Sequence, residues 1–288
     1  MNATYKYDTE EGWLNERFNW VTSTDVPVLL GLSQYSSPRL LWLEKRERRA
    51  IGRQENEYTR FGKRFEPLVI EDFEQATGLK VIRPHRYGLY CHNTEPLACS
   101  IDGAAYVNGE LVPVEIKNAW HDAAKQWDTE VPLSYQAQLQ TQLAVLGVSM
   151  GYFAVWLHTY GPPTFRLHPV KRDAAVIDTI TAKARTFRQQ VLDGIPPEVD
   201  GSAYTATALS QQYNQPVDEV IELDGSLMGV VDEVARWTEL SNQAEEHVTK
   251  RKNILRESLG QSVAGRLPDG RMVTWKPDKN GRRTLKVK

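Results

Sequence analysis

The segment "ACSIDGAAYVNGELVPVEIKNA", residues 98–119, reads as two β-strands joined by a tight turn. Apolar residues occupy every second position of its second strand, as expected when one face is buried. The dipeptide Asn108-Gly109 is typical of a two-residue hairpin turn. Glu115 and Lys117 are two positions apart, so they point to the same face of the strand. The segment therefore predicts a β-hairpin that carries an acid and a base side by side.

The hairpin also brings a second acid, Asp102, close to Glu115. Two neighbouring carboxylates repel each other unless a cation or a proton neutralises them. Oxygen ligands of this kind, with a backbone carbonyl such as that of Ile116, suit Mg²⁺ or Mn²⁺. The Lys117 ammonium would then orient a water and stabilise charge on a phosphate. The alternative is an ordinary Glu–Lys ion pair on an exposed strand.

A helix is predicted from "FGKRFEPLVIEDFEQATG", residues 61–78, in which apolar residues recur every four positions. Gly78 is expected to end this helix, and Pro67 is expected near its first turn. Glu66 lies at the margin of the apolar stripe. It either adds a carboxylate to the acidic pair or is an ordinary exposed glutamate.

A second helix is predicted from "SYQAQLQTQLAVLG", residues 134–147, with Ser134 as its N-cap and Gly147 as its stop. Gln138 and Gln142 lie one turn apart beside its apolar stripe. A glutamine near a metal site can orient a water or a phosphate oxygen. The alternative is a polar helix face that simply lacks charge.

The order of elements predicts an α/β fold with a mixed central sheet flanked by helices. This core is expected to cover residues 1–200, because "GIPPEVDGS" at residues 194–202 has the composition of a boundary. Residues 201–288 form an accessory region. A long helix is expected over residues 226–259, followed by a basic β-hairpin around "PDKNG".

Composition indicates a soluble globular protein, with 41% hydrophobic and 25% charged residues. The sequence has no apolar run long enough for a membrane span and no recognisable secretory signal. Its two cysteines, Cys91 and Cys99, fit no zinc spacing and read as reduced thiols. We therefore expect an intracellular, cytoplasmic protein.

Charge is unevenly distributed along the chain. Residues 250–288 contain twelve Lys and Arg against three Asp and Glu, a net charge of +9. The other 249 residues contain 23 bases and 34 acids, a net charge of −11. A basic tail of this kind suggests that it binds a polyanionic partner such as nucleic acid. The alternative is that the charges only solvate exposed helix faces.

Four segments in order resemble the phage lambda exonuclease and YqaJ-like viral recombinase family of the PD-(D/E)XK nuclease superfamily. The hairpin supplies the Asp-Gly and Glu-x-Lys elements of that family, although Ile101 stands where its motif often has Pro. The two helices supply the family's Gly-x-x-x-Glu and Pro-x-x-Tyr-x-x-Gln patterns, and a segment at residues 17–45 resembles its N-terminal region. The resemblance implies a restriction-endonuclease-like core.

The resemblance also implies roles for individual residues. Asp102, Glu115, the Ile116 carbonyl and Glu66 would hold Mg²⁺, for which Mn²⁺ can substitute, with two ions per site. Lys117 would position the attacking water, and Gln138 matches the family's glutamine beside the site. A pocket for the 5′-phosphate of a DNA end would comprise Arg17, Thr24 and Ser100. In the basic hairpin, Trp275, Arg282 and Arg283 are candidate DNA contacts.

The implied activity is a metal-dependent 5′→3′ exodeoxyribonuclease that acts on linear double-stranded DNA. It would leave 3′ single strands for recombination by a single-strand annealing protein. A homo-oligomer, with a trimer favoured by the resemblance, is expected. The alternatives are a related endonuclease and a DNA-binding module with a vestigial nuclease site.

Overall fold

The computed structural model describes residues 3–51, 57–127, 130–159 and 161–287 of the 288-residue chain. The chain divides into two compact units, Met1–Pro216 and Val217–Lys288. The first unit extends beyond the boundary expected at residue 200, because helix α8 (Ala203–Gln212) packs against α3 (Pro38–Glu47). No helix in the described part of the chain is long and apolar enough to span a lipid bilayer.

The centre of the first unit is a five-stranded mixed sheet in the order β3-β6-β7-β8-β9. Strands β7 and β8 run parallel, and the other neighbours are antiparallel. This arrangement confirms the predicted mixed sheet. The strands are β3 (Val81–Ile82), β6 (Gly103–Val107), β7 (Glu110–Trp120), β8 (Met150–His158) and β9 (Thr164–Lys171).

The predicted hairpin is formed by β6 and β7. Asn108 and Gly109 take the positive φ angles of 49° and 86° that a tight two-residue turn requires, and Val107 pairs with Glu110. Strand β6 begins at Gly103, which pairs with Val114. The preceding residue, Asp102, is therefore level with Glu115, just before β6 begins.

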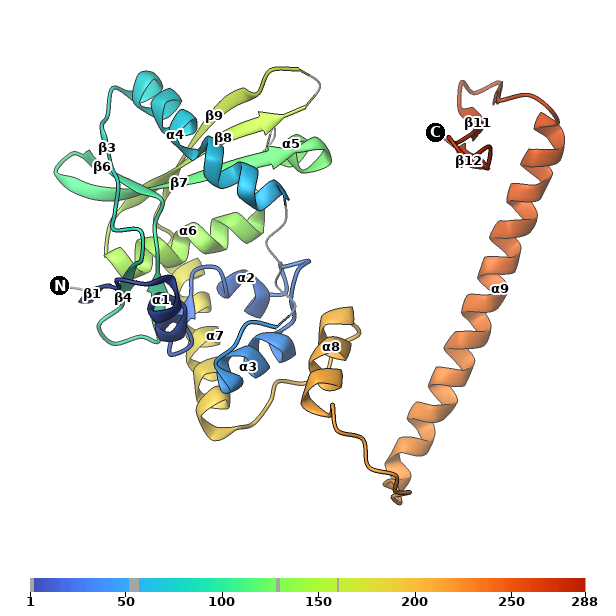
Figure 1. Ribbon diagram of the computed structural model, residues 1–288, viewed down its shortest axis with the longest axis horizontal. Coiled ribbons are helices and arrows are strands. Elements are labelled where there is room, and N and C mark those ends of the chain that lie inside the picture. The colour runs from blue at the N-terminus through green and yellow to red at the C-terminus, as the bar shows by residue number, and fades with distance from the viewer. Residues whose placement is uncertain (1–2, 52–56, 128–129, 160, 288) are drawn as a thin grey trace. The chain divides into compact units, whose positions relative to one another are not determined.

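Helices α4 (Glu57–Thr77) and α6 (Leu133–Leu146) cover opposite faces of this sheet (Figure 1). The α4 face is closed by a cluster that includes Phe73 and Ile116. The α6 face is closed by a cluster that includes Leu143 and Phe153. Strand β7 thus has side chains buried on both of its faces, as expected for a central strand.

Two predicted helix starts are wrong. Helix α4 begins at Glu57, so Pro67 lies inside the helix and not in its first turn. Its ring removes one backbone hydrogen bond from the helix. Helix α6 begins at Leu133 with Pro132 as the N-cap residue, so Ser134 caps nothing. The stops at Gly78 and Gly147 are confirmed, since both adopt left-handed conformations and close the last helical turn.

A second, four-stranded sheet in the order β1-β4-β5-β2 lies beside these layers and was not predicted. Its strand β5 (Leu97–Cys99) leads directly to Ser100 and Asp102, so this sheet supports one side of the hairpin. The other elements of the first unit are β1 (Ala3–Lys6), α1 (Glu10–Arg17), β2 (Val21–Thr22), α2 (Val26–Leu29), β4 (Gly88–Cys91), α5 (His121–Trp127) and α7 (Ala174–Asp193).

The second unit contains the predicted long helix, α9 (Met228–Leu259), preceded by the single turn η1 (Gly225–Leu227). The predicted hairpin is formed by β11 (Met272–Pro277) and β12 (Arg283–Val287), which are antiparallel. A third strand, β10 (Ala264–Arg266), pairs with β11 and makes a small sheet. The C-terminal helix and hairpin of the expected architecture are thereby confirmed.

Candidate active site

Glu115 lies in the middle of β7 and is only 3% exposed. Its Oε1 accepts hydrogen bonds from Lys117 Nζ at 2.6 Å and Gln138 Nε2 at 2.5 Å. Its Oε2 accepts one from Gln142 Nε2 at 2.6 Å. A carboxylate offers about four acceptor positions, so Oε2 keeps capacity for one further bond. The strand face that carries Glu115 and Lys117 is thus covered by the two glutamines of α6.

Asp102 is fixed by the backbone of the neighbouring strand. Its Oδ2 accepts a hydrogen bond of 2.9 Å from the N–H of Ile116, a group that β6 no longer pairs. Gly103 is required beside it, because a Cβ at this position would lie 2.6 Å from Val81 Cγ1. Burial and the charge of Glu115 raise the pKa of Asp102 to about 7, against the opposing effect of Lys117. The two carboxylates therefore interact strongly.

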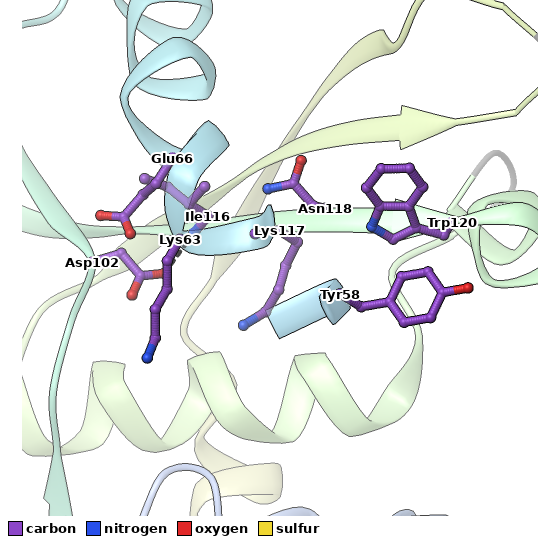
Figure 2. A pocket seen from close by; sticks show the side chains of 9 residues that line it. Tyr58, Lys63, Glu66, Asp102, Ile116, Lys117, Asn118 and Trp120 are labelled. Carbon is purple, nitrogen blue, oxygen red and sulfur yellow. Dashed lines mark hydrogen bonds between the residues drawn. The ribbon is translucent and has the colours of Figure 1, made fainter. Parts of the chain in front are cut away.

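Glu66 of α4 lies beside the same acids. It lines a cavity of about 310 Å³ together with Asp102, Ile116 and Lys117. Figure 2 shows the carboxylates of Glu66 and Asp102 directed towards the same space. Burial raises the pKa of Glu66, and the charge of Glu115 adds to this effect while Arg83 opposes it. Pro67 falls within the helix at this point, immediately after Glu66.

Lys117 connects the buried acids to the cavity. Its ammonium binds Glu115 and lies 5.2 Å from the centre of the Tyr135 ring. Burial alone would lower the pKa of Lys117, but the carboxylates of Glu115 and Asp102 raise it above its ordinary value. The amine is therefore a permanent cation at neutral pH. Tyr58, Gly62, Lys63, Asn118 and Trp120 complete the lining of the cavity.

Glu66 and Asp102 at the cavity, with Glu115 near Asp102, form an oxygen-rich group of possible ligands. Among the described residues, no three His, Cys, Asp or Glu side chains are close enough to form a metal centre as they stand. Burial is the largest cause of the raised pKa values of Asp102 and Glu66, and the charge of Glu115 adds to both. The donor set fits a hard divalent cation that draws these oxygens together.

The three residues predicted for phosphate binding lie in one cluster around Trp13. The Arg17 guanidinium stacks 4.5 Å from the Trp13 ring centre and donates to Thr24 Oγ1 at 3.0 Å. Trp13 Nε1 donates to Ser100 Oγ at 3.1 Å. Thr22, which also accepts from Arg17, belongs to the same cluster. Ser100 is two residues from Asp102, so the cluster adjoins the acidic pair along the chain.

A buried ion pair supports this cluster. Lys45 Nζ lies 2.6 Å from Asp25 Oδ2, and both side chains are almost fully buried. The same amine donates to the carbonyls of Arg17 and Trp20 at 2.9 and 2.7 Å. Asp25 Oδ2 also accepts from the backbone N–H of Thr22 at 2.8 Å. The ion pair therefore fixes the backbone that carries the predicted phosphate-binding side chains.

The three candidate DNA contacts of the second unit have different surroundings. The Arg283 guanidinium stacks 3.6 Å from the Trp275 ring centre and donates to the carbonyls of Trp275, Gly260 and Ser262. Arg283 and Trp275 thus connect the small sheet to the end of α9. Arg282 is exposed and lies in the β11–β12 turn. Lys276 and Lys286 are also exposed, and they line a groove on the face away from Trp275.

Sequence reasoning missed several of these neighbours. Gln142 is not among the site residues predicted from the sequence, although its one-turn spacing from Gln138 indicates that both reach the same target. The pairing of Asp25 with Lys45 spans twenty residues and two elements, so no local pattern reports it. Trp13 is likewise joined to Ser100 across 87 residues.

Known proteins resemble this chain in sequence and in fold. The uncharacterized protein YqaJ of Bacillus subtilis (strain 168) is 26% identical over 280 residues, which cover 93% of this chain and 84% of that protein. This similarity extends into the second unit. The crystal structure of the alkaline exonuclease LHK-Exo from Laribacter hongkongensis has a TM-score of 0.52 at 23% identity.

A second structure, LHK-Exo in complex with dAMP, has a TM-score of 0.53 at 22% identity. Both matches cover 64% of this chain and 94% of the matched chain, and they show a shared fold. The model of the YqaJ-like viral recombinase domain matches residues 12–149, a range that includes the acidic hairpin, both flanking helices and the Arg17 cluster. Residues 12–149 of this chain are therefore similar to the YqaJ-like viral recombinase domain, as the four sequence segments indicated.

Proposed function

We propose that this protein is a metal-dependent 5′→3′ exodeoxyribonuclease that acts on the ends of linear double-stranded DNA. The observation that carries the proposal is the arrangement of Asp102 and Lys117 at one cavity, with Glu66 facing it from α4 and Glu115 bonded to Lys117. The family of residues 12–149 and the fold shared with an alkaline exonuclease support a nuclease.

The proposed reaction is hydrolysis of a phosphodiester. Water attacks phosphorus, the P–O3′ bond breaks, and O3′ leaves with a proton while the next nucleotide keeps the 5′-phosphate. Asp102, Glu115, Glu66 and the Ile116 carbonyl would hold one or two Mg²⁺ or Mn²⁺ ions. When bound, such an ion supplies Lewis-acid stabilisation of the charge on the phosphate.

Residues of the chain itself account for the remaining steps. Lys117 holds the attacking water and stabilises negative charge on the phosphorane with its permanent positive charge. Gln138 and Gln142 hold the Glu115 carboxylate in one orientation, so that it binds an ion without rotating. Tyr58 and Trp120, whose rings are in edge contact, form one side of the cavity.

The direction of digestion rests on the cluster around Trp13. Arg17, Thr24 and Ser100 offer a guanidinium and hydroxyl groups, which are suited to a terminal 5′-phosphate. A phosphate held there would fix the terminal nucleotide beside Asp102, two residues along from Ser100. Digestion from the 5′ end then leaves a 3′ single strand, the substrate of a single-strand annealing protein in phage-type recombination.

Two further expectations belong to this proposal. Exposed bases of the second unit, including Arg282, Lys276 and Lys286, would bind the phosphate backbone of duplex DNA. The family resemblance also favours a homo-oligomer, in particular a trimer, acting in the cytoplasm of a bacterial or phage-infected cell. Sedimentation of the protein with and without duplex DNA measures both the oligomeric state and the binding of DNA.

The activity is tested with end-labelled duplexes. Linear DNA with a 5′-phosphate should be digested in Mg²⁺ to mononucleotides and 3′ single strands, while closed circles stay intact. Substrates with a 5′-hydroxyl should react more slowly. Glu115→Gln and Lys117→Met should bind DNA without cutting it. Equal cutting of circles would indicate an endonuclease, and binding without cutting by the unaltered protein in Mg²⁺ and Mn²⁺ would indicate a vestigial site.

A further inference from the structure

Helix α9 presents a long apolar seam to solvent. Residues at alternating spacings of three and four, the a and d positions of a heptad repeat, run through the whole helix. None of the residues of α9, all of which are described, is buried. Val234 is 62% exposed, Trp237 63% and Val248 50%. The seam consists of Leu227, Val230, Val234, Trp237, Ser241, Ala244, Val248, Arg251 and Leu255.

The charges of α9 are divided between its two halves. Residues 228–247 contain five acids and one base, a net charge of −4, whereas residues 248–259 contain four bases and one acid, a net charge of +3. Two such helices attract each other when they lie antiparallel and repel each other when they lie parallel. The charge pattern therefore favours a second α9 helix as the partner that packs on the seam, in the antiparallel direction.

We propose that α9 pairs with α9 of a second copy of this chain as an antiparallel two-stranded coiled coil. In antiparallel pairs an a position faces a d position. One register satisfies this rule for the seam residues from Val230 to Leu255 and joins residues whose numbers add to 485. It places Val230 opposite Leu255, Val234 opposite Arg251, Trp237 opposite Val248, and Ser241 opposite Ala244.

The least apolar member of the seam, Arg251, fits this direction. In a parallel pair, Arg251 would face its own copy inside the seam, with two guanidinium groups in contact. In the antiparallel register it faces Val234 of the second copy. The neighbouring residue of that copy, Glu233, is then available to the guanidinium as a counter-ion.

The largest side chain of the seam also finds space in this register. A groove of about 340 Å³ lies beside Val248, between α9 and the small sheet, and it is lined by Val248, Leu255 and Val287 among others. Trp237 of the second copy faces Val248, so its indole would enter this groove. The small residues Ser241 and Ala244 let the two helices approach closely at the centre of the seam.

The first experiment measures the mass of the full-length protein by light scattering across a range of concentrations. Val234→Arg puts a second guanidinium opposite Arg251 of the second copy and should raise the dissociation constant of pairing by about tenfold or more. The mass then falls to half of its original value where α9 alone joins the paired copies. Ala235→Arg, which adds the same charge one position away from the seam, should leave the mass unchanged.

Disulfide trapping tests the register. The protein with both Trp237→Cys and Val248→Cys should form covalent dimers rapidly, whereas Trp237→Cys alone should not. Within one helix the two positions are eleven residues apart, about 16 Å, and cannot join each other. The native Cys91 and Cys99 are buried and do not compete.

Three results would overturn the proposal. Dimers of the single Trp237→Cys protein would mean a parallel pair. A mass that Val234→Arg does not change would mean that the seam is covered by the first unit of the same chain or by a different partner. Absence of trapping in the double variant would exclude the register. The proposal is independent of nuclease activity, so Glu115→Gln protein should pair as well as the unaltered protein does.

Discussion

The amide of Gln142 in α6 and the carboxylate of Glu115 in β7 are joined by a hydrogen bond of 2.6 Å between Nε2 and Oε2. The two residues are 27 positions apart, and Gln142 is completely buried. Its Nε2 also lies 3.4 Å from the Ser100 carbonyl, so one side chain connects the acid to the segment that leads to Asp102. The orientation of Glu115 therefore depends on the helix as well as on the strand.

Replacement of Gln142 should affect catalysis more than folding. Gln142→Met keeps the volume but removes the donor to Glu115, and the rate of DNA digestion should fall by about 10–100-fold. Gln140→Met is the matched control on the same helix, because Gln140 bonds to the Lys171 carbonyl and not to the acids. The control should lose stability while keeping its rate per folded molecule. Single-turnover digestion and thermal unfolding of both variants distinguish the two roles.

Arg17 should determine the preference for a 5′-phosphate. Arg17→Gln removes the charge that stacks on Trp13, and the preference for phosphorylated over hydroxyl ends should fall by about tenfold or more. The measurement is the ratio of kcat/KM for the two substrates. Arg185→Gln, which breaks only a surface pair with Glu95, should leave that ratio unchanged. An unaltered ratio in Arg17→Gln protein would refute the phosphate pocket.

Asp25 should make the stability of the first unit depend on pH. Burial alone would raise the pKa of its carboxyl, but the charges of Lys45 and Arg17 and the hydrogen bonds from Lys45 and Thr22 lower it below the ordinary 3.8. A lowered pKa stabilises the folded state above about pH 4, and this contribution is lost as the pH falls through the pKa of the folded protein.

Asp25→Asn leaves the Lys45 ammonium buried without a carboxylate and should lower the free energy of unfolding by about 3–5 kcal/mol at neutral pH. Denaturant unfolding at several pH values should also show that the variant lacks the acid-dependent component. Asp122→Asn, which breaks an exposed pair with Lys125, is the control and should change little. A normal stability of Asp25→Asn protein would contradict the supporting role of the ion pair.

Arg283 and Arg282 should behave differently although they are neighbours. Arg283→Met loses three hydrogen bonds to carbonyls, so residues 260–288 should become more sensitive to proteolysis. Arg282→Met should leave the fold intact and weaken binding to duplex DNA, lowering the salt-dependence slope by about one. Limited proteolysis and salt titrations of binding separate these effects. Equal loss of DNA affinity without proteolysis would restore Arg283 as a direct contact.

The two thiols should be almost unreactive in the folded protein. Burial and the charge of Glu16 raise the pKa of Cys91 from 9.0 to about 12, and burial raises that of Cys99 as well. At pH 8 the thiolate fraction of Cys91 then falls about a thousandfold below that of an ordinary cysteine. Labelling with a thiol reagent should proceed only as the protein unfolds. Rapid labelling under native conditions would contradict the packing around β4 and β5.

The elements that the sequence predicts well are those whose signals are local. The Asn108-Gly109 turn, the alternation in β7 and the glycine stops of α4 and α6 each depend on a few adjacent residues. The starts of α4 and α6 differ from the prediction because each helix begins before the residue expected to mark its start. Whether Pro67 or Ser134 lies at a helix start depends on the conformation of the residues before it. The second sheet joins short strands across long distances in the chain, and no periodic pattern reports such pairings.

The candidate site shows the same division. Asp102, Glu115 and Lys117 follow from hairpin geometry, because the turn fixes which residues face each other. Glu66 and Gln138 needed the family resemblance, since helices far apart in the sequence bring them to the strand. The internal role of Arg283 could not be predicted, because a basic residue in a basic segment gives no sign of which carbonyls it reaches.

The position of α6 in the crossover between β7 and β8 has a consequence for the order of folding. The hairpin that brings Asp102 to Glu115 closes a loop of thirteen residues. The contact between Gln142 and Glu115 joins residues that are 27 positions apart, and the parallel pairing of β7 with β8 joins residues that are still farther apart. Short loops close faster than long ones, and parallel pairing comes late. During synthesis or refolding, the two acids therefore meet before the glutamines cover them. Recovery of nuclease activity should mark the completion of this crossover rather than the first appearance of the sheet.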